Sequence, residues 1–161
     1  MKKVLNTIFL CLTLVMGLVA CDDKHDKIPP TGGLDNAEKL VVGTYTGTWS
    51  RTNLSTMAEE SKPGSITFSV DESLGNNVTV ITVDSELDLG LNAPTCAANI
   101  SRLSSGVLSY WNVTTSSNPF GTSFTGKVSP EGVATMQYNK VVRSGRKEVE
   151  FSYTFSGNKQ Q

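Results

Sequence analysis

The chain has 161 residues, with 14 basic and 15 acidic side chains, so its formal net charge is −1. It shows no basic block and no arginine-rich segment, and we therefore expect no nucleic-acid partner. Its only histidine, His25, lies close to the N-terminus. The rest of the chain therefore has no imidazole to activate a serine or cysteine nucleophile, which excludes Ser-His-Asp and Cys-His catalysis there.

Residues 1–20 have the pattern of an export signal. Lys2 and Lys3 precede an almost wholly apolar run over residues 4–20, which ends in small residues directly before Cys21. A basic segment, an apolar segment and small residues at the cleavage point are typical of a secretory signal peptide. The alternative is an uncleaved transmembrane anchor, for which this run of 17 residues is at the short limit.

The stretch Leu18-Val19-Ala20-Cys21 resembles a bacterial lipobox. The resemblance implies that the Cys21 thiol receives a diacylglyceryl group, that residues 1–20 are removed, and that the new N-terminus is then acylated. Several acyl chains on one residue hold a protein stably on a bilayer, whereas a single chain is marginal. We therefore expect attachment to a membrane through Cys21.

The two residues after this cysteine are Asp22 and Asp23, and they bear on the membrane to which the protein is sorted. An acidic start resembles the export signal that sends lipoproteins of Bacteroidetes-type bacteria to the cell surface. In other Gram-negative bacteria, an aspartate directly after the cysteine instead favours retention in the inner membrane. We expect a lipid-anchored protein of the cell envelope at the outer membrane, and leave open surface display and inner-membrane retention.

Residues 21–37 are expected to form a flexible tether. Charged residues at 22–27 are followed by Ile28-Pro29-Pro30-Thr31-Gly32-Gly33, and large apolar residues are scarce. His25 and the aspartates around it lack the rigid support that a metal site requires, so we expect no metal there. Removing residues 1–20 from 161 leaves 141, enough for one domain and too few for two, and we place that domain at residues 38–157.

Cys96 is the one cysteine of the predicted domain, because Cys11 lies in the signal and Cys21 is the lipidation site. No intramolecular disulfide is therefore expected, although an exported protein is allowed one. A cysteine in an apolar strand without a nearby histidine favours a small buried hydrophobe over a reactive thiol.

The predicted domain is rich in threonine, valine, serine and aromatic residues, and glycine and asparagine interrupt it at short intervals. One helical turn is expected over residues 35–40 and a loop over residues 55–63. Alternation of apolar and polar residues predicts strands with a period of two. These strands cover residues 42–50 with a continuation to 54, 65–70, 78–83, 85–91, 95–103, 107–114, 122–128, 133–142 and 148–155.

Eight or nine short strands joined mostly by short turns predict an all-β fold. The two architectures that fit are an antiparallel meander closed into a roughly eight-stranded barrel and, as the alternative, a β-sandwich. We favour the barrel because closure removes exposed strand edges without a disulfide or a metal.

The stretch Val42-Gly43-Thr44-Tyr45-Thr46-Gly47-Thr48-Trp49 shortly after a lipobox resembles the calycin-like β-barrel lipoproteins of Bacteroidetes-type bacteria. Its last three residues are similar to the Gly-x-Trp sequence in the first strand of lipocalins. That resemblance implies that Trp49 closes one end of the barrel beneath an arginine from near the last strand, here Arg143 or Arg146. The chain lacks the Thr-Asp-Tyr motif of classical lipocalins and a cysteine pair joining its termini.

Residues 84–90 carry carboxylates at alternate positions, Asp84, Glu86 and Asp88, followed by Gly90. Alternate oxygens before a glycine suggest a calcium loop, but leucines lie between them in strand register and no bidentate glutamate follows at the expected distance. We interpret these carboxylates as side chains on the solvent-exposed face of a strand. No pair of carboxylates stands out as an acid and a base, so we expect no enzyme activity, no metal and no cofactor.

Two functions fit a barrel of this kind. The first is binding of a small hydrophobic ligand inside the barrel. The candidate lining residues are Tyr45, Trp49, Phe68, Trp111, Phe124, Tyr153 and Phe155. The alternative is a non-enzymatic interaction module of a surface complex, with a filled core and an exposed patch for an envelope protein partner. Met57, or Phe120 with Asn118-Pro119, is a candidate for that patch, and the state of the barrel interior distinguishes the two functions.

Overall fold

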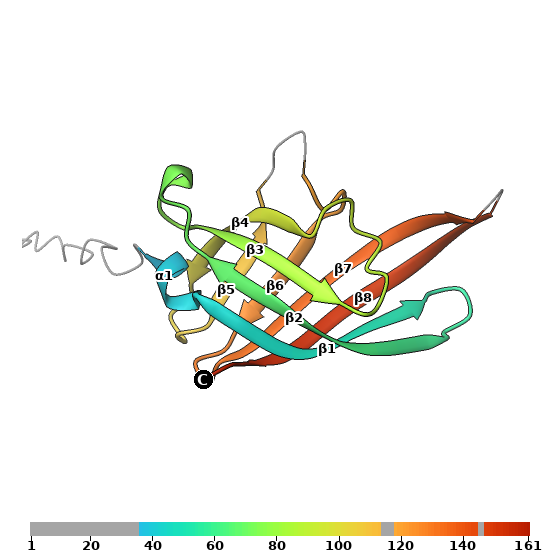
Figure 1. The fold of residues 1–161 in the computed structure, drawn as a ribbon, viewed down its shortest axis with the longest axis horizontal. Helices are drawn as coiled ribbons and strands as arrows, with labels where there is room; N and C mark the ends of the chain where they lie inside the picture. The colour runs from blue at the N-terminus through green and yellow to red at the C-terminus, as the bar shows by residue number, and fades with distance from the viewer. Residues whose placement is uncertain (1–35, 114–117, 145–146) are drawn as a thin grey trace, which may run out of the picture. The chain divides into compact units, whose positions relative to one another are not determined.

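The computed structural model describes residues 36–113, 118–144 and 147–161. They form one closed barrel in which eight antiparallel strands follow one another in sequence order (Figure 1). The elements are α1 (Ala37–Val41), β1 (Gly43–Asn53), β2 (Glu59–Ser69), η1 (Glu72–Leu74), β3 (Val78–Ser85), β4 (Thr95–Arg102), β5 (Leu108–Asn112), β6 (Phe124–Val128), β7 (Val133–Ser144) and β8 (Lys147–Lys159). The predicted closed meander is confirmed, and the sandwich alternative is wrong.

The predicted export signal, the predicted lipidation site Cys21 and Arg146 lie outside the described residues. The predicted tether ended at residue 37 and the predicted domain spanned residues 38–157. In the structure, Ala37 is already the first residue of α1, and β8 continues to Lys159. Within the described residues, no helix combines the length and apolarity needed to cross a membrane.

Alternation along the strands divides the barrel wall into an apolar inner face and a polar outer face. On β8, Tyr153 and Phe155 are buried, whereas Thr154 and Ser156 between and beyond them are exposed. Successive side chains of a strand point to opposite faces, so each strand contributes to both surfaces. The inner face is thereby a continuous core, and the outer face is mostly serine and threonine.

The glycine of the Gly-x-Trp sequence lies where the barrel closes. Gly47 of β1 lies opposite Gly157 of β8 on one side and opposite Gly64 of β2 on the other. A side chain at Gly47 would collide with the backbone of Ser156, and one at Gly64 would collide with the Trp49 ring. Glycine at these positions therefore lets the strands approach closely and bend.

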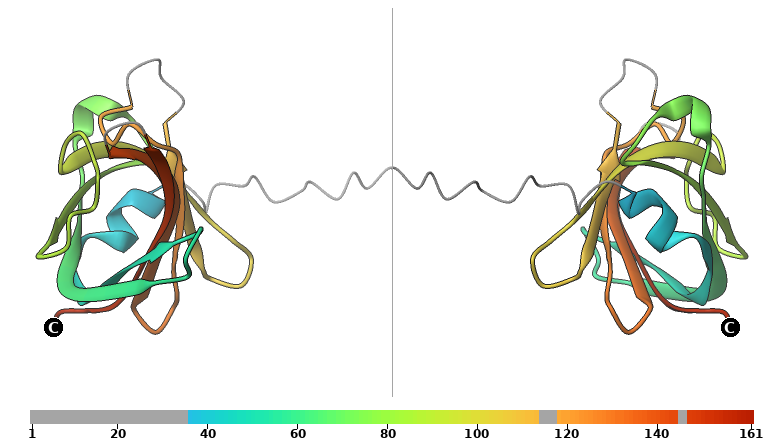
Figure 2. Two further views of the ribbon diagram at one scale, coloured as in Figure 1. Left: turned by 90° about the vertical axis from the view of Figure 1, so that its right-hand side faces the viewer. Right: turned by 90° about the vertical axis from the view of Figure 1, so that its left-hand side faces the viewer.

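Helix α1 lies across one end of the barrel, as the end-on views of Figure 2 show. Ala37 and Val41 of this helix are buried, and the Tyr45 hydroxyl donates a 3.0 Å hydrogen bond to the Val41 carbonyl. The buried Glu38 carboxylate accepts a hydrogen bond of 3.1 Å from the Asn77 amide in the turn between β2 and β3. The expected helical turn over residues 35–40 is therefore a cap that closes this end.

The opposite end is covered by residues 86–94, where the sequence predicted a strand over residues 85–91. That prediction is wrong, because β3 ends at Ser85 and the next segment turns inward. Leu87 and Leu89 are buried as the alternation indicated, and the Tyr138 hydroxyl donates a 2.8 Å hydrogen bond to the Leu89 carbonyl. The alternating leucines are therefore buried because this segment covers the end of the core, and not because it forms a strand of the sheet.

The hairpins β1–β2 and β7–β8 extend beyond the other strands at this end (Figure 1). Strand β2 begins at Glu59, so the predicted loop over residues 55–63 is wrong for its second half. At the base of this extension, the Arg51 guanidinium lies 5.1 Å from the Phe151 ring centre and 2.7 Å from a Glu60 carboxylate oxygen.

The proposed stacking of Arg143 over Trp49 is wrong. Arg143 lies near the tip of the β7–β8 hairpin, where its side chain is 80% exposed and pairs with Glu148 at 2.7 Å. Trp49 instead packs against Tyr138 and Phe155. The long hairpin carries the arginine away from the closed barrel, which chain position alone did not indicate.

Candidate functional site

Six of the seven predicted lining residues point into the barrel, and all six are buried: Tyr45, Trp49, Phe68, Phe124, Tyr153 and Phe155. They come from β1, β2, β6 and β8, so closure of the sheet brings them together. Tyr110 and Tyr138, which the sequence analysis did not select, are buried among them.

These rings pack against one another instead of bordering an open space. The Phe68 ring centre lies 5.4 Å from that of Tyr45 and 5.0 Å from that of Tyr110, in both cases edge to face. The ring centres of Trp49 and Phe155 are 5.1 Å apart. Distances of about 4.5–7 Å are those of favourable aromatic contacts, so the predicted ligand-lining residues form the packed core of the barrel.

The hydroxyls of Tyr110 and Tyr138 in this core form structural hydrogen bonds. The Tyr110 hydroxyl donates a 2.7 Å hydrogen bond to the Thr135 carbonyl, and the Tyr138 hydroxyl donates one to the Leu89 carbonyl in residues 86–94. Burial raises the pKa of both phenols, so each remains a neutral donor. The Trp49 Nε1 atom is buried and has no partner among the described residues.

Cys96 lies on the inner face of β4 and is 4% exposed, which confirms its interpretation as a small buried hydrophobe. Burial raises the pKa of its thiol to about 12. The thiolate is the reactive form of cysteine, and at neutral pH it is therefore scarce.

Trp111 does not line the interior. It is 38% exposed on the outer face of β5, while its neighbours Leu108 and Tyr110 point inward. The sequence predicted Trp111 to be one of the residues that line the barrel interior, and that prediction is wrong. Both 110 and 111 are aromatic, so alternation alone did not settle which of them faces the core.

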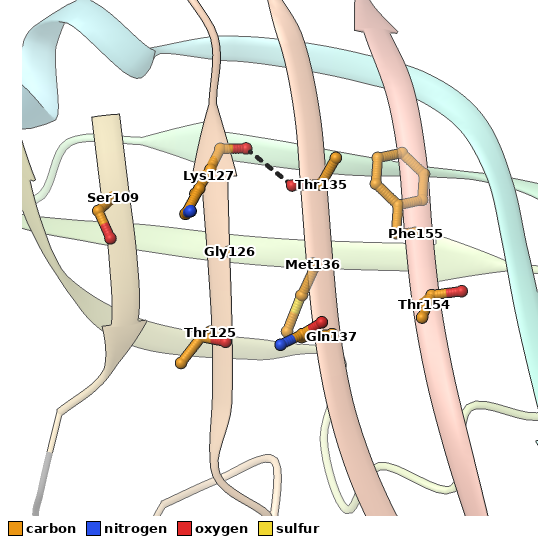
Figure 3. A pocket seen from close by; sticks show the side chains of 9 residues that line it. All are labelled: Ser109, Thr125, Gly126, Lys127, Thr135, Met136, Gln137, Thr154 and Phe155. Atoms are coloured by element: carbon orange, nitrogen blue, oxygen red, sulfur yellow. Dashed lines mark hydrogen bonds between the residues drawn. The ribbon is translucent and has the colours of Figure 1, made fainter. Parts of the chain in front are cut away.

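The outer face of β5 to β8 carries a hollow of about 380 Å³ (Figure 3). Its lining is Ser109, Thr125, Gly126, Lys127, Thr135, Met136, Gln137, Thr154 and Phe155. A second hollow of about 550 Å³ adjoins it and shares Thr125 and Gln137, and Trp111 lines this second hollow. Together they form a trough over four strands, which we call the outer trough.

A third hollow, of about 460 Å³, lies at the end of the barrel near α1. Tyr45 and Leu108 contribute its apolar part, and Arg102 and Lys159 contribute positive charge. The Lys159 ammonium lies 5.8 Å from the Tyr45 ring centre, a distance that allows cation–π attraction.

The carboxylates at residues 84–90 do not converge. Asp84 and Asp88 are exposed, and Asp88 accepts a hydrogen bond of 2.9 Å from the Gly90 amide within its own turn. Among the described residues, no three histidine, cysteine, aspartate or glutamate side chains lie together as a metal site requires.

Phe120, a candidate for an exposed patch, is fully buried and packs against Phe124 at 5.3 Å, so that prediction is wrong. Met57 is 72% exposed in the turn between β1 and β2, as the patch prediction required. The exposed aromatic that the sequence analysis missed on the outer surface is Trp111.

No protein-family model matches the chain, and no curated protein matches it.

Proposed function

We propose that the protein is a non-enzymatic interaction module, anchored in the cell envelope by lipid on Cys21, that binds its partner through its outer surface. The observation that carries this proposal is the packed interior. An eight-stranded barrel can hold one small ligand only if its core leaves room. Here the inward side chains fill that space with touching rings.

The native mass of the full-length chain tests the packed interior. The protein is purified from its membrane, offered fatty acid or haem in excess, and weighed intact under native conditions. We expect the mass of the protein with its own acyl chains only. An additional stoichiometric adduct that leaves on denaturation, and that the Lys159→Gln variant of the hollow near α1 retains, would establish a ligand inside the barrel and overturn the proposal.

The lipid anchor has its own test. Cells that express the full-length chain are fed an alkyne-tagged fatty acid, and the protein is then probed for the tag and for its presence in the membrane fraction. The wild-type chain should carry the tag, and the Cys21→Ser variant should lose it. A tag that persists in Cys21→Ser, or an untagged wild-type chain in the membrane, would contradict anchoring through Cys21.

A second candidate function is binding of an anionic amphiphile at the end of the barrel near α1. The observation that favours it is the hollow in which Lys159 and Arg102 stand beside Tyr45 and Leu108. The carboxylate of such an amphiphile would pair with the cations, while its apolar chain would pack on Tyr45 and Leu108. Fatty-acid uptake that disappears in Lys159→Gln and persists in Lys127→Gln would support this function, whereas equal uptake by both variants would exclude this site.

A further inference from the structure

The outer trough contains four side chains in a straight row across four strands. Trp111 of β5 lies opposite Thr125 of β6, Thr125 lies opposite Gln137 of β7, and Gln137 lies opposite Thr154 of β8. All four are exposed. Neighbouring strands are about 4.8 Å apart, so the row spans about 14 Å. An indole ring, a hydroxyl, an amide and a hydroxyl thus follow one another at regular spacing.

Some hydroxyls elsewhere on the outer face are paired with each other. The cross-strand pairs on β1 to β4 are Thr44–Thr67 at 3.0 Å, Ser50–Ser61 at 2.7 Å and Thr82–Thr95 at 3.1 Å. Among the described residues, by contrast, the side chains of Thr125, Gln137 and Thr154 make no hydrogen bond. Their donors and acceptors are therefore available to a ligand.

Trp111 supplies an apolar surface beside these polar groups. Trp111 lines the larger hollow, and the residue is 38% exposed. An exposed tryptophan offers a flat apolar face together with an N–H donor. A ligand that matches the row must therefore have an apolar face and many hydroxyl groups.

The charge of the trough further limits the classes of ligand that it can bind. Among the described residues, Lys127 is the only charged side chain that lines either hollow, and it lies at the end away from Trp111. A polyanion is recognised by several cationic groups, and this trough offers one. The lining therefore favours a neutral ligand.

We infer that the outer trough is a binding site for a neutral oligosaccharide. A sugar ring has C–H groups on one face, which pack on the indole of Trp111. Its hydroxyl groups both donate and accept, so they can bond Gln137 and the threonines on either side. This inference rests on the proposal that the outer surface is the binding surface, and it names the class of ligand.

The test is isothermal titration calorimetry of the full-length chain with a panel of oligosaccharides. The detergent must have no sugar headgroup, because a glycosidic detergent would compete for the trough. The panel contains neutral oligomers of glucose, mannose, galactose, xylose and N-acetylglucosamine, together with oligogalacturonate as the anionic comparison. We expect binding of at least one neutral oligomer and weaker or no binding of oligogalacturonate.

Variants then locate the site. Trp111→Ala should weaken binding at least about tenfold, which corresponds to about 1.4 kcal/mol. Trp111→Phe should retain part of the affinity, and Gln137→Ala should also weaken it. Met57→Ala, which removes an exposed side chain from the turn between β1 and β2, is the matched control and should bind as the wild type does. Unchanged thermal unfolding of each variant shows that the barrel is intact.

Three outcomes would overturn the inference: no binding of any neutral oligomer, binding of oligogalacturonate alone, or binding that neither Trp111→Ala nor Gln137→Ala weakens. Failure of the oligosaccharide inference can be distinguished from failure of the proposed interaction module. A clean native mass with no sugar binding would leave the interaction module without this ligand. A mass adduct from inside the barrel would overturn the module whatever the trough binds.

Discussion

The inner and outer faces of the barrel wall are built from alternate residues of the same strands, yet they have different chemistry. On β6 and β7, Phe124, Met136 and Tyr138 are buried, whereas Thr125 and Gln137 between them are exposed. The inner residues are closely packed, and packed cores respond strongly to changes in volume. This difference indicates that the stability of the protein depends mainly on its inner face. The outer face contributes less to stability, and its side chains are available to contact a ligand.

Among substitutions on the two faces, the largest loss of stability is expected from Trp49→Ala. Trp49 is fully buried between Tyr138 and Phe155, and its truncation leaves a large void. Truncation of a buried tryptophan costs about 3–5 kcal/mol of the free energy of unfolding. Urea unfolding measures the loss, and Trp49→Phe should lose clearly less. A loss below about 1 kcal/mol in Trp49→Ala would show that the core is not closely packed.

Gly126→Ala tests the inner face from the opposite direction, by adding volume. A methyl group at this inward position would collide with the Tyr110 ring and with the Thr135 carbonyl. Overpacking of a core typically costs about 1–3 kcal/mol. Chemical denaturation should show this loss, whereas Thr125→Ala, one residue away on the outer face, should cost much less. Equal effects at the two positions would contradict the division between the faces.

Tyr110→Phe removes one hydroxyl without changing the packing of the ring. The Thr135 carbonyl then loses the 2.7 Å hydrogen bond that Tyr110 donates. A hydrogen bond of this kind contributes about 0.5–1.5 kcal/mol to the free energy of unfolding. Ser109→Ala, which removes an outward hydroxyl from the same strand, is the matched control. If both variants unfold at the same urea concentration, this hydrogen bond adds nothing to stability.

Gln137→Ala should change the free energy of unfolding by no more than about 0.5 kcal/mol, because its side chain is exposed in the outer trough. Its effect should instead appear in oligosaccharide binding. Urea unfolding and calorimetry on one preparation separate the two. A large loss of stability would show that Gln137 is a structural residue of the sheet.

The last prediction uses the two tryptophans, the only ones in the chain, as fluorescent reporters of the two faces. In Trp111→Phe the remaining emission comes from the buried Trp49, and in Trp49→Phe it comes from the exposed Trp111. Acrylamide should quench the first variant weakly and the second strongly. A neutral oligosaccharide should protect only the second variant. Similar quenching of both would mean that the two rings are equally accessible.

The sequence by itself determined the all-β class, the number of strands to within one and the closed meander, because short alternating segments and turn residues are local signals. It also selected most of the inward aromatic residues, where one member of each alternating pair is apolar and the other polar. The last strand, with Phe151, Tyr153 and Phe155 facing one way, is the clearest case. The lipobox and its consequences remain predictions from sequence.

Tertiary structure decided the positions at which local alternation was ambiguous or was satisfied in another way. Tyr110 and Trp111 are adjacent aromatics, and only the packing of Tyr110 against Phe68 selects which one is buried. The leucines of residues 85–91 cap the core because β3 ends before them. The outer trough depends on the register between consecutive strands, which aligns Trp111 with Gln137 across β6. Alternation shows that a strand has two faces, but only its neighbours determine which face is inside and what lies beside it.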